Sequence, residues 1–142
     1  VAAYEKYGGP LIIVDFGTAI TFDVVSRNGE YLGGAISPGV QLSLEALFEN
    51  AAKLPRVELT EPRHVIGKST IESVHSGTIH GFASLIDGMV AKIQAELDQK
   101  ARVIATGGTV GLIVSLSNSI DIVDPFLTLE GLRIIHQRNQ DG

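Results

Sequence analysis

The stretch over residues 11–39, LIIVDFGTAITFDVVSRNGEYLGGAISPG, constrains the fold more than any other part of the chain. It contains three apolar, β-rich runs at 11–14, 20–25 and 31–36. Asn28-Gly29 between the second and third runs is a strong hairpin signal, because both residues tolerate positive φ angles. Consecutive strands usually lie next to one another, so this stretch predicts an antiparallel meander.

The first run ends in residues that suit phosphate binding. Asp15 closes the buried run, Gly17 leaves backbone N–H groups open to a ligand, and Thr18 adds a hydroxyl. A carboxylate, bare amides and a hydroxyl at one turn suit a cation beside a phosphate. An ordinary β-turn, in which Asp and Gly only shape the backbone, explains the same residues equally well.

Composition limits the classes of protein to consider. The 142 residues are 44% hydrophobic, enough for one domain with a real core. No apolar run approaches the length of about 18 residues that suggests a membrane span. A net charge of −5 with scattered Lys and Arg disfavours nucleic-acid binding, and the absence of Cys excludes disulfides. The chain has no initiator Met and opens like the end of a helix, so we expect a fragment or a processed chain.

Helices alternate with strands after the meander. Ser69 with Glu72 three residues later is a capping box and begins the best-signalled helix. The predicted elements are helices at 1–7, about 40–52, 69–99, 112–116 and about 128–137, and strands at 102–106 and 120–123. The last helix is predicted to bury Leu129, Leu132 and Ile135. This order outlines a ribonuclease-H-like α/β domain with a mixed sheet, which also serves sugar kinases, actin-like ATPases and nucleases.

The helix predicted over 69–99 carries an apolar core stripe and a second stripe of small residues. The small residues are Ser73, Gly77, Gly81, Ser84 and Gly88. Each glycine inside a helix costs about 1 kcal/mol relative to alanine, so a close backbone approach must offset that cost. Packing within the domain and contact across a dimer both explain it. His75 and His80 lie about 140° apart around the helix, so we expect ordinary surface histidines.

Gly107-Gly108 follows the strand at 102–106 and precedes a short helix. A strand, a glycine-rich turn and a helix N-terminus form an element that can contact a nucleotide phosphate. A tight strand-to-helix turn without a ligand is the alternative interpretation.

Five stretches together resemble the type III pantothenate kinase family, some of whose members carry the name Bvg accessory factor. They are DFGTAIT at 15–21, GGAISPG at 33–39, GKST at 67–70 followed by SG at 76–77, TGG at 106–108, and LTLEGL at 127–132. The match covers nearly the whole chain in order.

The resemblance implies a bacterial, cytoplasmic enzyme that phosphorylates pantothenate to 4'-phosphopantothenate, the first step of coenzyme A biosynthesis. It implies two ribonuclease-H-like domains per subunit and a homodimer, with no nucleic-acid or membrane partner. Mg-ATP is the implied co-substrate, and a monovalent cation, potassium or ammonium, is the implied cofactor.

Site residues follow from the same resemblance. Asp15 is similar to the family's monovalent-cation ligand, and Thr18 with Gly17 to its ATP phosphate contact. Thr70 is similar to a pantothenate contact near the dimer interface. The turns similar to the family's nucleotide-side loops are Gly33-Gly34 and Gly107-Gly108.

Two family motifs do not occur in this sequence. One is an Asp-x-Gly-Asn-Thr phosphate loop; the other is a Gly-x-Asp-Arg motif whose Asp is the family's proposed catalytic base. By family spacing the second motif would end just before Val1. The resemblance therefore assigns residues 1–142 to the C-terminal domain of a two-domain kinase with its N-terminal half absent. We expect no catalytic residue in this chain and no activity from this domain alone.

Two other classes of function compete with a kinase. The accessory-factor name suggests a non-catalytic regulatory protein, although the acidic composition argues against direct DNA binding. A ribonuclease-H-type nuclease needs carboxylates clustered around two metal ions. The carboxylates available for that cluster are Asp15, Asp23, Asp87 and Asp124.

Overall fold

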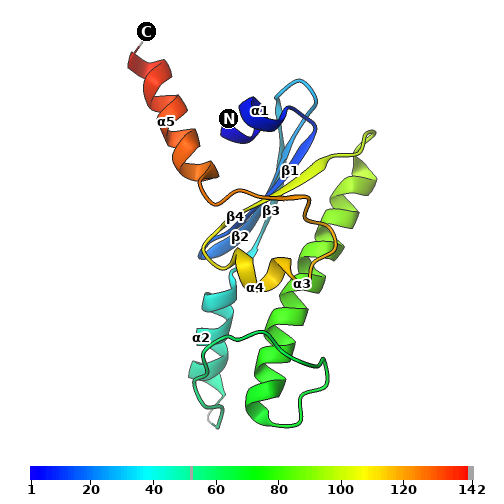
Figure 1. Cartoon of the computed structure of the whole chain (residues 1–142), viewed down its shortest axis with the longest axis vertical. Coiled ribbons are helices and arrows are strands. Elements are labelled where there is room, and N and C mark those ends of the chain that lie inside the picture. Colours follow the sequence, from blue (N-terminus) through cyan, green and yellow to red (C-terminus); the bar gives the residue numbers. More distant parts are fainter. Residues whose placement is uncertain (52, 141–142) are drawn as a thin grey trace.

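A computed structural model of the chain describes residues 1–51 and 53–140. Its centre is a five-stranded mixed sheet in the order β3-β2-β1-β4-β5 (Figure 1). β1 pairs antiparallel with β2 and parallel with β4, which confirms the predicted meander followed by αβ units. The strands are β1 (Leu11–Phe16), β2 (Ala19–Val25), β3 (Tyr31–Pro38), β4 (Arg102–Gly107) and β5 (Ile122–Val123).

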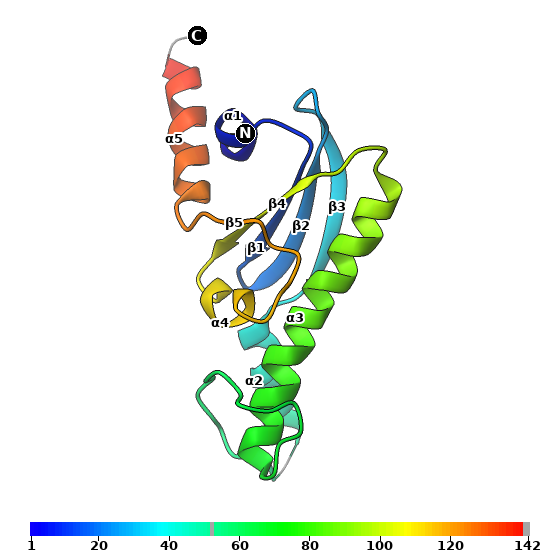
Figure 2. The same ribbon diagram turned by 45° about the vertical axis from the view of Figure 1, so that its right-hand side comes forward.

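The helices cover the two faces of the sheet unequally. The long helix α3 and the short α4 pack on one face, whereas α1 and the start of α5 lie on the other (Figure 2). None of the described helices combines the length and hydropathy needed to cross a membrane. The helices are α1 (Ala2–Tyr7), α2 (Val40–Asn50), α3 (Thr70–Glu96), α4 (Val110–Val114) and α5 (Leu127–Gln140); Ala52, the predicted end of the second helix, lies outside the described residues.

Strand alternation decides which residues enter the main core. Ile12, Val14 and Phe16 of β1 are at most 1% exposed and pack toward α3 and α4. Ile13 and Asp15 alternate with them and therefore point to the opposite face. That face is covered only in part, so the polar residues of β1 and β2 remain accessible there.

The capping box of α3 is confirmed with one change of partner. The Ser69 hydroxyl accepts a hydrogen bond from the Glu72 N–H at 3.2 Å. The Glu72 carboxylate accepts from the Lys68 N–H at 2.7 Å, one residue before the expected donor. Both bonds satisfy amides at the helix start, which fixes where α3 begins.

The small-residue stripe of α3 is exposed, although the backbone of Gly67 lies against Ser73 at its start. A Cβ added at Gly77, Gly81 or Gly88 would meet no atom within 4 Å. Packing against this domain's own sheet or helices therefore does not explain these glycines.

His75 and His80 differ from the prediction of ordinary surface histidines. The Nε2 atom of each ring is buried without a hydrogen-bond partner among the described residues. The Nδ1 atom of His75 lies 3.2 Å from the Thr60 hydroxyl, because the loop before α3 folds back along the helix. Helical periodicity does not reveal such a loop, and for this reason the sequence suggested exposed rings.

The prediction of a buried apolar face on α5 is wrong. Leu129, Leu132 and Ile135 are 62%, 62% and 46% exposed, and only Leu127 is buried. The helix packs beside α1 through Leu127 and Ile134, and its Arg138 pairs with Glu5 of α1, while the predicted apolar face stays exposed (Figure 1). An amphipathic pattern shows that a helix has an apolar face but does not show what covers it.

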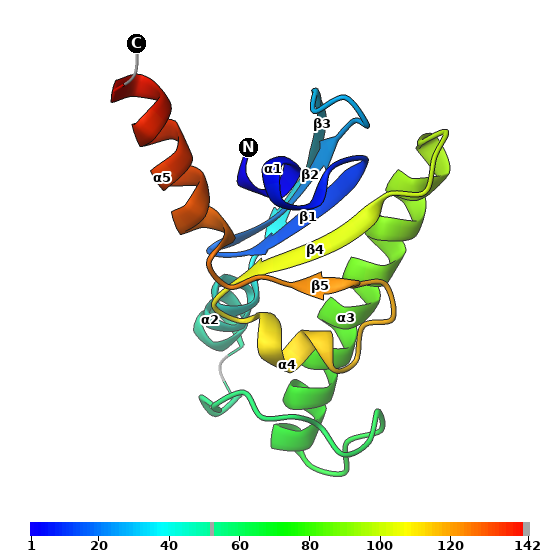
Figure 3. The same cartoon turned by 45° about the horizontal axis from the view of Figure 1, so that its top comes forward.

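Asp124 directly follows β5, the strand that pairs with β4 at the edge of the sheet (Figure 3). Its buried carboxylate accepts from Lys6 Nζ at 2.8 Å and from the Tyr7 hydroxyl at 2.7 Å. The Lys6 ammonium, aided by the Tyr7 hydroxyl and the Phe126 N–H, holds the pKa of Asp124 below its usual value despite burial. The carboxylate thus holds α1 against the segment that leads into α5.

Candidate functional site

The parallel pairing of β1 with β4 brings two polar residues side by side. Asp15 is paired with Thr106, and Phe16 with Gly107 at the carboxyl ends of these strands. Ligands of open α/β sheets bind outside the carboxyl ends of parallel strands. Two turns that are far apart in the sequence, the one after β1 and the one after β4, therefore meet at one edge of the sheet.

The turn between β1 and β2 lies against the start of α2. The Gly39 N–H donates to the Thr18 carbonyl at 2.9 Å. A Cβ on Gly39 would come within 2.1 Å of that oxygen, so only glycine allows this approach. No side chain caps α2, and its first amides lie next to the exposed Gly17 and Thr18. Helix N-terminal amides favour anions, and the sequence had not identified this contribution to the site.

Gly107 and Gly108 have different physical reasons to be glycine. Gly107 adopts a φ of +105°, and a Cβ there would lie 2.6 Å from the Phe16 carbonyl oxygen. It is therefore needed for the close approach of β4 to β1. Gly108 is exposed, and a Cβ there would meet nothing within 4 Å. This glycine leaves its backbone open beside the turn that follows β1.

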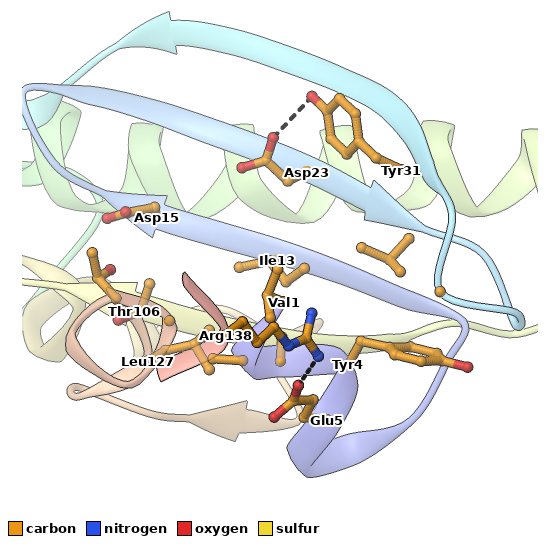
Figure 4. A pocket seen from close by; sticks show the side chains of 16 residues that line it. Val1, Tyr4, Glu5, Ile13, Asp15, Asp23, Tyr31, Thr106, Leu127 and Arg138 are labelled. Atoms are coloured by element: carbon orange, nitrogen blue, oxygen red, sulfur yellow. Dashed lines mark hydrogen bonds and ion pairs between the residues drawn. The ribbon is translucent and has the colours of Figure 1, made fainter. Parts of the chain in front are cut away.

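Beside this edge, on the face of the sheet opposite α3, lies a cleft of about 540 Å³. Its walls come from the sheet, α1 and α5 (Figure 4). The volume lies in the range of small-molecule sites, about 300–1,000 Å³. Its polar or titratable lining residues are Tyr4, Glu5, Asp15, Asp23, Tyr31, Thr106, Thr128 and Arg138.

Asp15 and Asp23 lie on the same face of the sheet. Asp15 is paired with Thr21 and Ile13 with Asp23, which places the two carboxylates diagonally across adjacent strands. Sequence spacing alone had not fixed a shared face, because the turn length between β1 and β2 determines it. The resulting surface is negative, and Arg138, the basic residue of the cleft lining, is paired with Glu5.

The two carboxylates have different hydrogen-bond environments. Asp23 accepts from the Tyr31 hydroxyl at 3.1 Å and from the Thr21 hydroxyl at 3.2 Å, and the bond to Asp23 raises the pKa of Tyr31. Asp15 accepts no hydrogen bond from any described residue. Burial, and then the charge of Asp23, raise the pKa of Asp15. A half-buried carboxylate without a donor is a good position for a cation.

The remaining predicted site residues lie elsewhere. Gly33 and Gly34 line a separate groove between β3 and α3. Gly33 has a φ of +110° beside a β-bulge, and a Cβ on Gly34 would lie 1.9 Å from the Phe22 carbonyl oxygen. Thr70 is exposed at the first turn of α3, beside a hollow that Leu47 of α2 also lines. Within a single chain, Thr70 therefore does not line the cleft that contains Asp15.

A nuclease would need a cluster of carboxylates, but the fold places Asp87 and Asp124 away from Asp15 and Asp23. The Asp87 carboxylate accepts from the hydroxyls of Ser117 and Ser119, both at 2.6 Å. Although burial would raise the pKa of Asp87, these bonds and the backbone amides of the same turn lower it. Asp124 is held by Lys6. Within residues 1–51 and 53–140, no three metal-ligating side chains come together.

Comparison with known proteins agrees with this architecture. The chain resembles, with a TM-score of 0.67 and 23% identity, a conserved Baf family protein from Campylobacter jejuni described as a transcriptional activator. That match covers 99% of this chain and 63% of the other. The ethanolamine utilization protein EutJ from Carboxydothermus hydrogenoformans matches with a TM-score of 0.52 and 22% identity, over 92% of this chain and 51% of the other. These likenesses confirm the ribonuclease-H-like α/β fold.

Sequence relatives are closer. The chain is 57% identical to the type III pantothenate kinase of Moorella thermoacetica and 55% identical to that of Myxococcus xanthus, over 98% of this chain. It covers 55% and 54% of those proteins, so it spans about half the length of the curated relatives it matches. The family model described as type III pantothenate kinase matches residues 1–92. These identities, together with the motifs in the β1 turn, show that the chain belongs to the type III pantothenate kinase family.

Proposed function

We propose that this chain is the C-terminal ribonuclease-H-like domain of a two-domain kinase that phosphorylates pantothenate with ATP to give 4'-phosphopantothenate. In this proposal the domain supplies the cation site, part of the nucleotide site and the dimer contacts. The observation that carries it is the meeting of Asp15, the Gly17-Thr18 turn and the Gly107-Gly108 turn at one edge of the sheet.

Each part of this edge has a task in phosphoryl transfer, which depends on positioning and charge neutralisation. The Thr18 hydroxyl and the first amides of α2 hold phosphate oxygens of Mg-ATP. The Gly17 N–H instead donates to the Ala19 carbonyl at 3.1 Å and fixes the shape of the turn. The exposed Gly108 lets the nucleotide approach the backbone after β4. In this proposal the catalytic base comes from the other half of the longer protein, and Asp15 serves as the cation ligand.

The environment of Asp15 fits a monovalent cation, potassium or ammonium. Its carboxylate has no donor among the described residues, and Asp23 adds a second negative charge on the same face. A bound cation would supply a fixed positive charge next to the transferred phosphate. The residues of this chain hold that ion; they do not exchange protons with the substrate.

The proposal is tested by pantothenate-dependent ADP formation in the full-length protein, with and without potassium, and in residues 1–142 alone. Activity only in the full-length, potassium-containing sample is the expected result. No ADP in any sample would reject the kinase and favour a regulatory role for the fold.

Gly81→Leu is expected to disrupt the proposed homodimer. The exposed small-residue stripe of α3 allows a second helix to approach closely, and a leucine there would hold the backbones apart. A dimer would also explain how Thr70 reaches a cleft that it does not line in its own chain. Sedimentation velocity of the full-length protein should show monomers at concentrations where the wild type is dimeric.

The matched control is Glu49→Leu, an exposed position on a different helix, α2. It adds a similar apolar side chain and should leave the sedimentation coefficient unchanged. An unchanged sedimentation coefficient for Gly81→Leu would instead show that the small-residue stripe is not part of the dimer interface.

A further inference from the structure

Thr106 is the buried polar side chain of the cleft whose role the proposed function leaves open. It is 3% exposed, yet its hydroxyl makes no hydrogen bond with any described residue. The enclosed side-chain polar atoms without a partner in the described chain are His75 Nε2 and His80 Nε2, so the Thr106 hydroxyl keeps an open side toward the cleft, where a ligand can reach it. Thr106 also lines the cleft, so its hydroxyl has access to such a ligand.

The sheet register places this hydroxyl beside Asp15. The two residues are directly paired in the parallel β1–β4 ladder, where neighbouring strands are about 4.8 Å apart. Side chains of paired residues in neighbouring strands point to the same face. Figure 4 shows Asp15 and Thr106 at the same end of the cleft.

The charge around Thr106 favours a cation over an anion. Asp15 and Asp23 both face the cleft, and Arg138 is occupied by Glu5. A threonine hydroxyl keeps two acceptor lone pairs, so it can offer a neutral oxygen next to the carboxylate of Asp15. A carboxylate with a neutral oxygen beside it can hold a singly charged ion. Mg²⁺ also binds through one or two carboxylates in phosphoryl-transfer sites, and for this reason the test below includes competition by magnesium.

We propose that the hydroxyl of Thr106 is a second protein ligand of the monovalent cation bound by Asp15. This inference deepens the proposed function and rests on its cation site. The ion then bridges β1 and β4, so it also joins the Gly17-Thr18 turn to the Gly107-Gly108 turn. Thr106 is a positioning residue: it acts on the nucleotide through the ion and the spacing of these turns.

The test uses Thr106→Val in the full-length protein, with thallous ion as the potassium analogue. Valine has nearly the same shape and lacks only the ligand oxygen. Equilibrium dialysis should show a dissociation constant for thallous ion about tenfold higher than in the wild type, and Thr106→Ser should restore it to within about twofold. The control Thr128→Val removes an exposed hydroxyl from the α5 wall of the cleft and should bind thallous ion normally.

Two outcomes would overturn the inference, and a second variant covers a failure to fold. A dissociation constant within twofold of the wild type for Thr106→Val, while Asp15→Asn abolishes binding, overturns it. Complete displacement of thallous ion by equimolar magnesium also overturns it, because the site would then be divalent. If the valine variant fails to fold, as judged by circular dichroism in potassium-free buffer, Thr106→Ala decides in its place.

ADP formation in the same preparations separates this inference from the proposed function. A wild type that binds thallous ion through Asp15 and Thr106 but forms no ADP rejects the kinase and keeps the ligand assignment. A wild type that forms ADP only with potassium, while Thr106→Val binds thallous ion normally, keeps the kinase and rejects the assignment.

Discussion

Asp15→Asn is expected to abolish the potassium dependence of pantothenate phosphorylation and to lower kcat about a hundredfold at saturating potassium. Asparagine keeps the shape of the side chain but removes the charge that holds the cation. A hundredfold loss corresponds to about 2.7 kcal/mol of transition-state stabilisation, in the range of one lost electrostatic contact in a closed site. The measurement is ADP release as a function of potassium concentration.

The same residue predicts a direction for the pH dependence. Burial and the neighbouring Asp23 raise the pKa of Asp15, so its carboxylate takes up a proton at a higher pH than an ordinary aspartate. Protonation removes the cation's ligand, and the apparent affinity for potassium should therefore fall as the pH is lowered.

Asp23→Asn is the matched variant for this titration. It removes the neighbouring charge and should shift the loss of potassium affinity to lower pH, while burial of Asp15 is unchanged. Equal pH profiles for wild type and Asp23→Asn would show that the two carboxylates do not interact. If potassium activated Asp15→Asn as fully as the wild type, Asp15 would not be the cation ligand.

Gly39→Ala is expected to lower the free energy of unfolding by about 3 kcal/mol and to raise the KM for ATP. The added Cβ would lie 2.1 Å from the Thr18 carbonyl oxygen and 2.6 Å from that of Gly17. Both neighbours are backbone atoms that cannot rotate away, so the turn must move. Urea denaturation and ATP saturation curves of the full-length protein measure the two effects.

Gly111→Ala is the matched control for this substitution. A Cβ at Gly111, in α4, would meet nothing within 4 Å. Alanine in a helix should therefore leave the protein unchanged or stabilise it by about 0.5–1 kcal/mol. If Gly39→Ala and Gly111→Ala had the same stability and ATP saturation, the start of α2 would not support the nucleotide turn.

The fold could be predicted because local signals and motif order agreed. Asn28-Gly29 fixed the hairpin, and Ser69 with Glu72 marked the first turn of α3. The environment of Leu129 and Leu132 could not be predicted, because periodicity identifies an apolar face without its partner. The loop that covers part of His75 and His80 could not be predicted either. An irregular backbone segment has no repeating pattern of apolar residues in the sequence.

The candidate site was partly readable from sequence. Asp15, Gly17 and Thr18 are contiguous, so their chemistry could be recognised in one stretch. Thr106 and Gly39 could not be joined to them, since their closeness depends on strand register and on a backbone contact. The assignments of Gly33, Gly34 and Thr70 remain predictions, and the first two also have backbone reasons to be glycine.

The position of β1 between β2 and β4 has a consequence for how the protein folds. Leu11 pairs with Val25 on one side, close in sequence, and with Arg102 on the other side, beyond the whole of α3. Closing the longer loop costs more chain entropy, so the hairpin should form early and β4 should dock late. In pulse-labelled hydrogen exchange, amides of β2 should gain protection before those of β4. The cation site would then become complete only in the final stage of folding, when Thr106 arrives beside an Asp15 already in place.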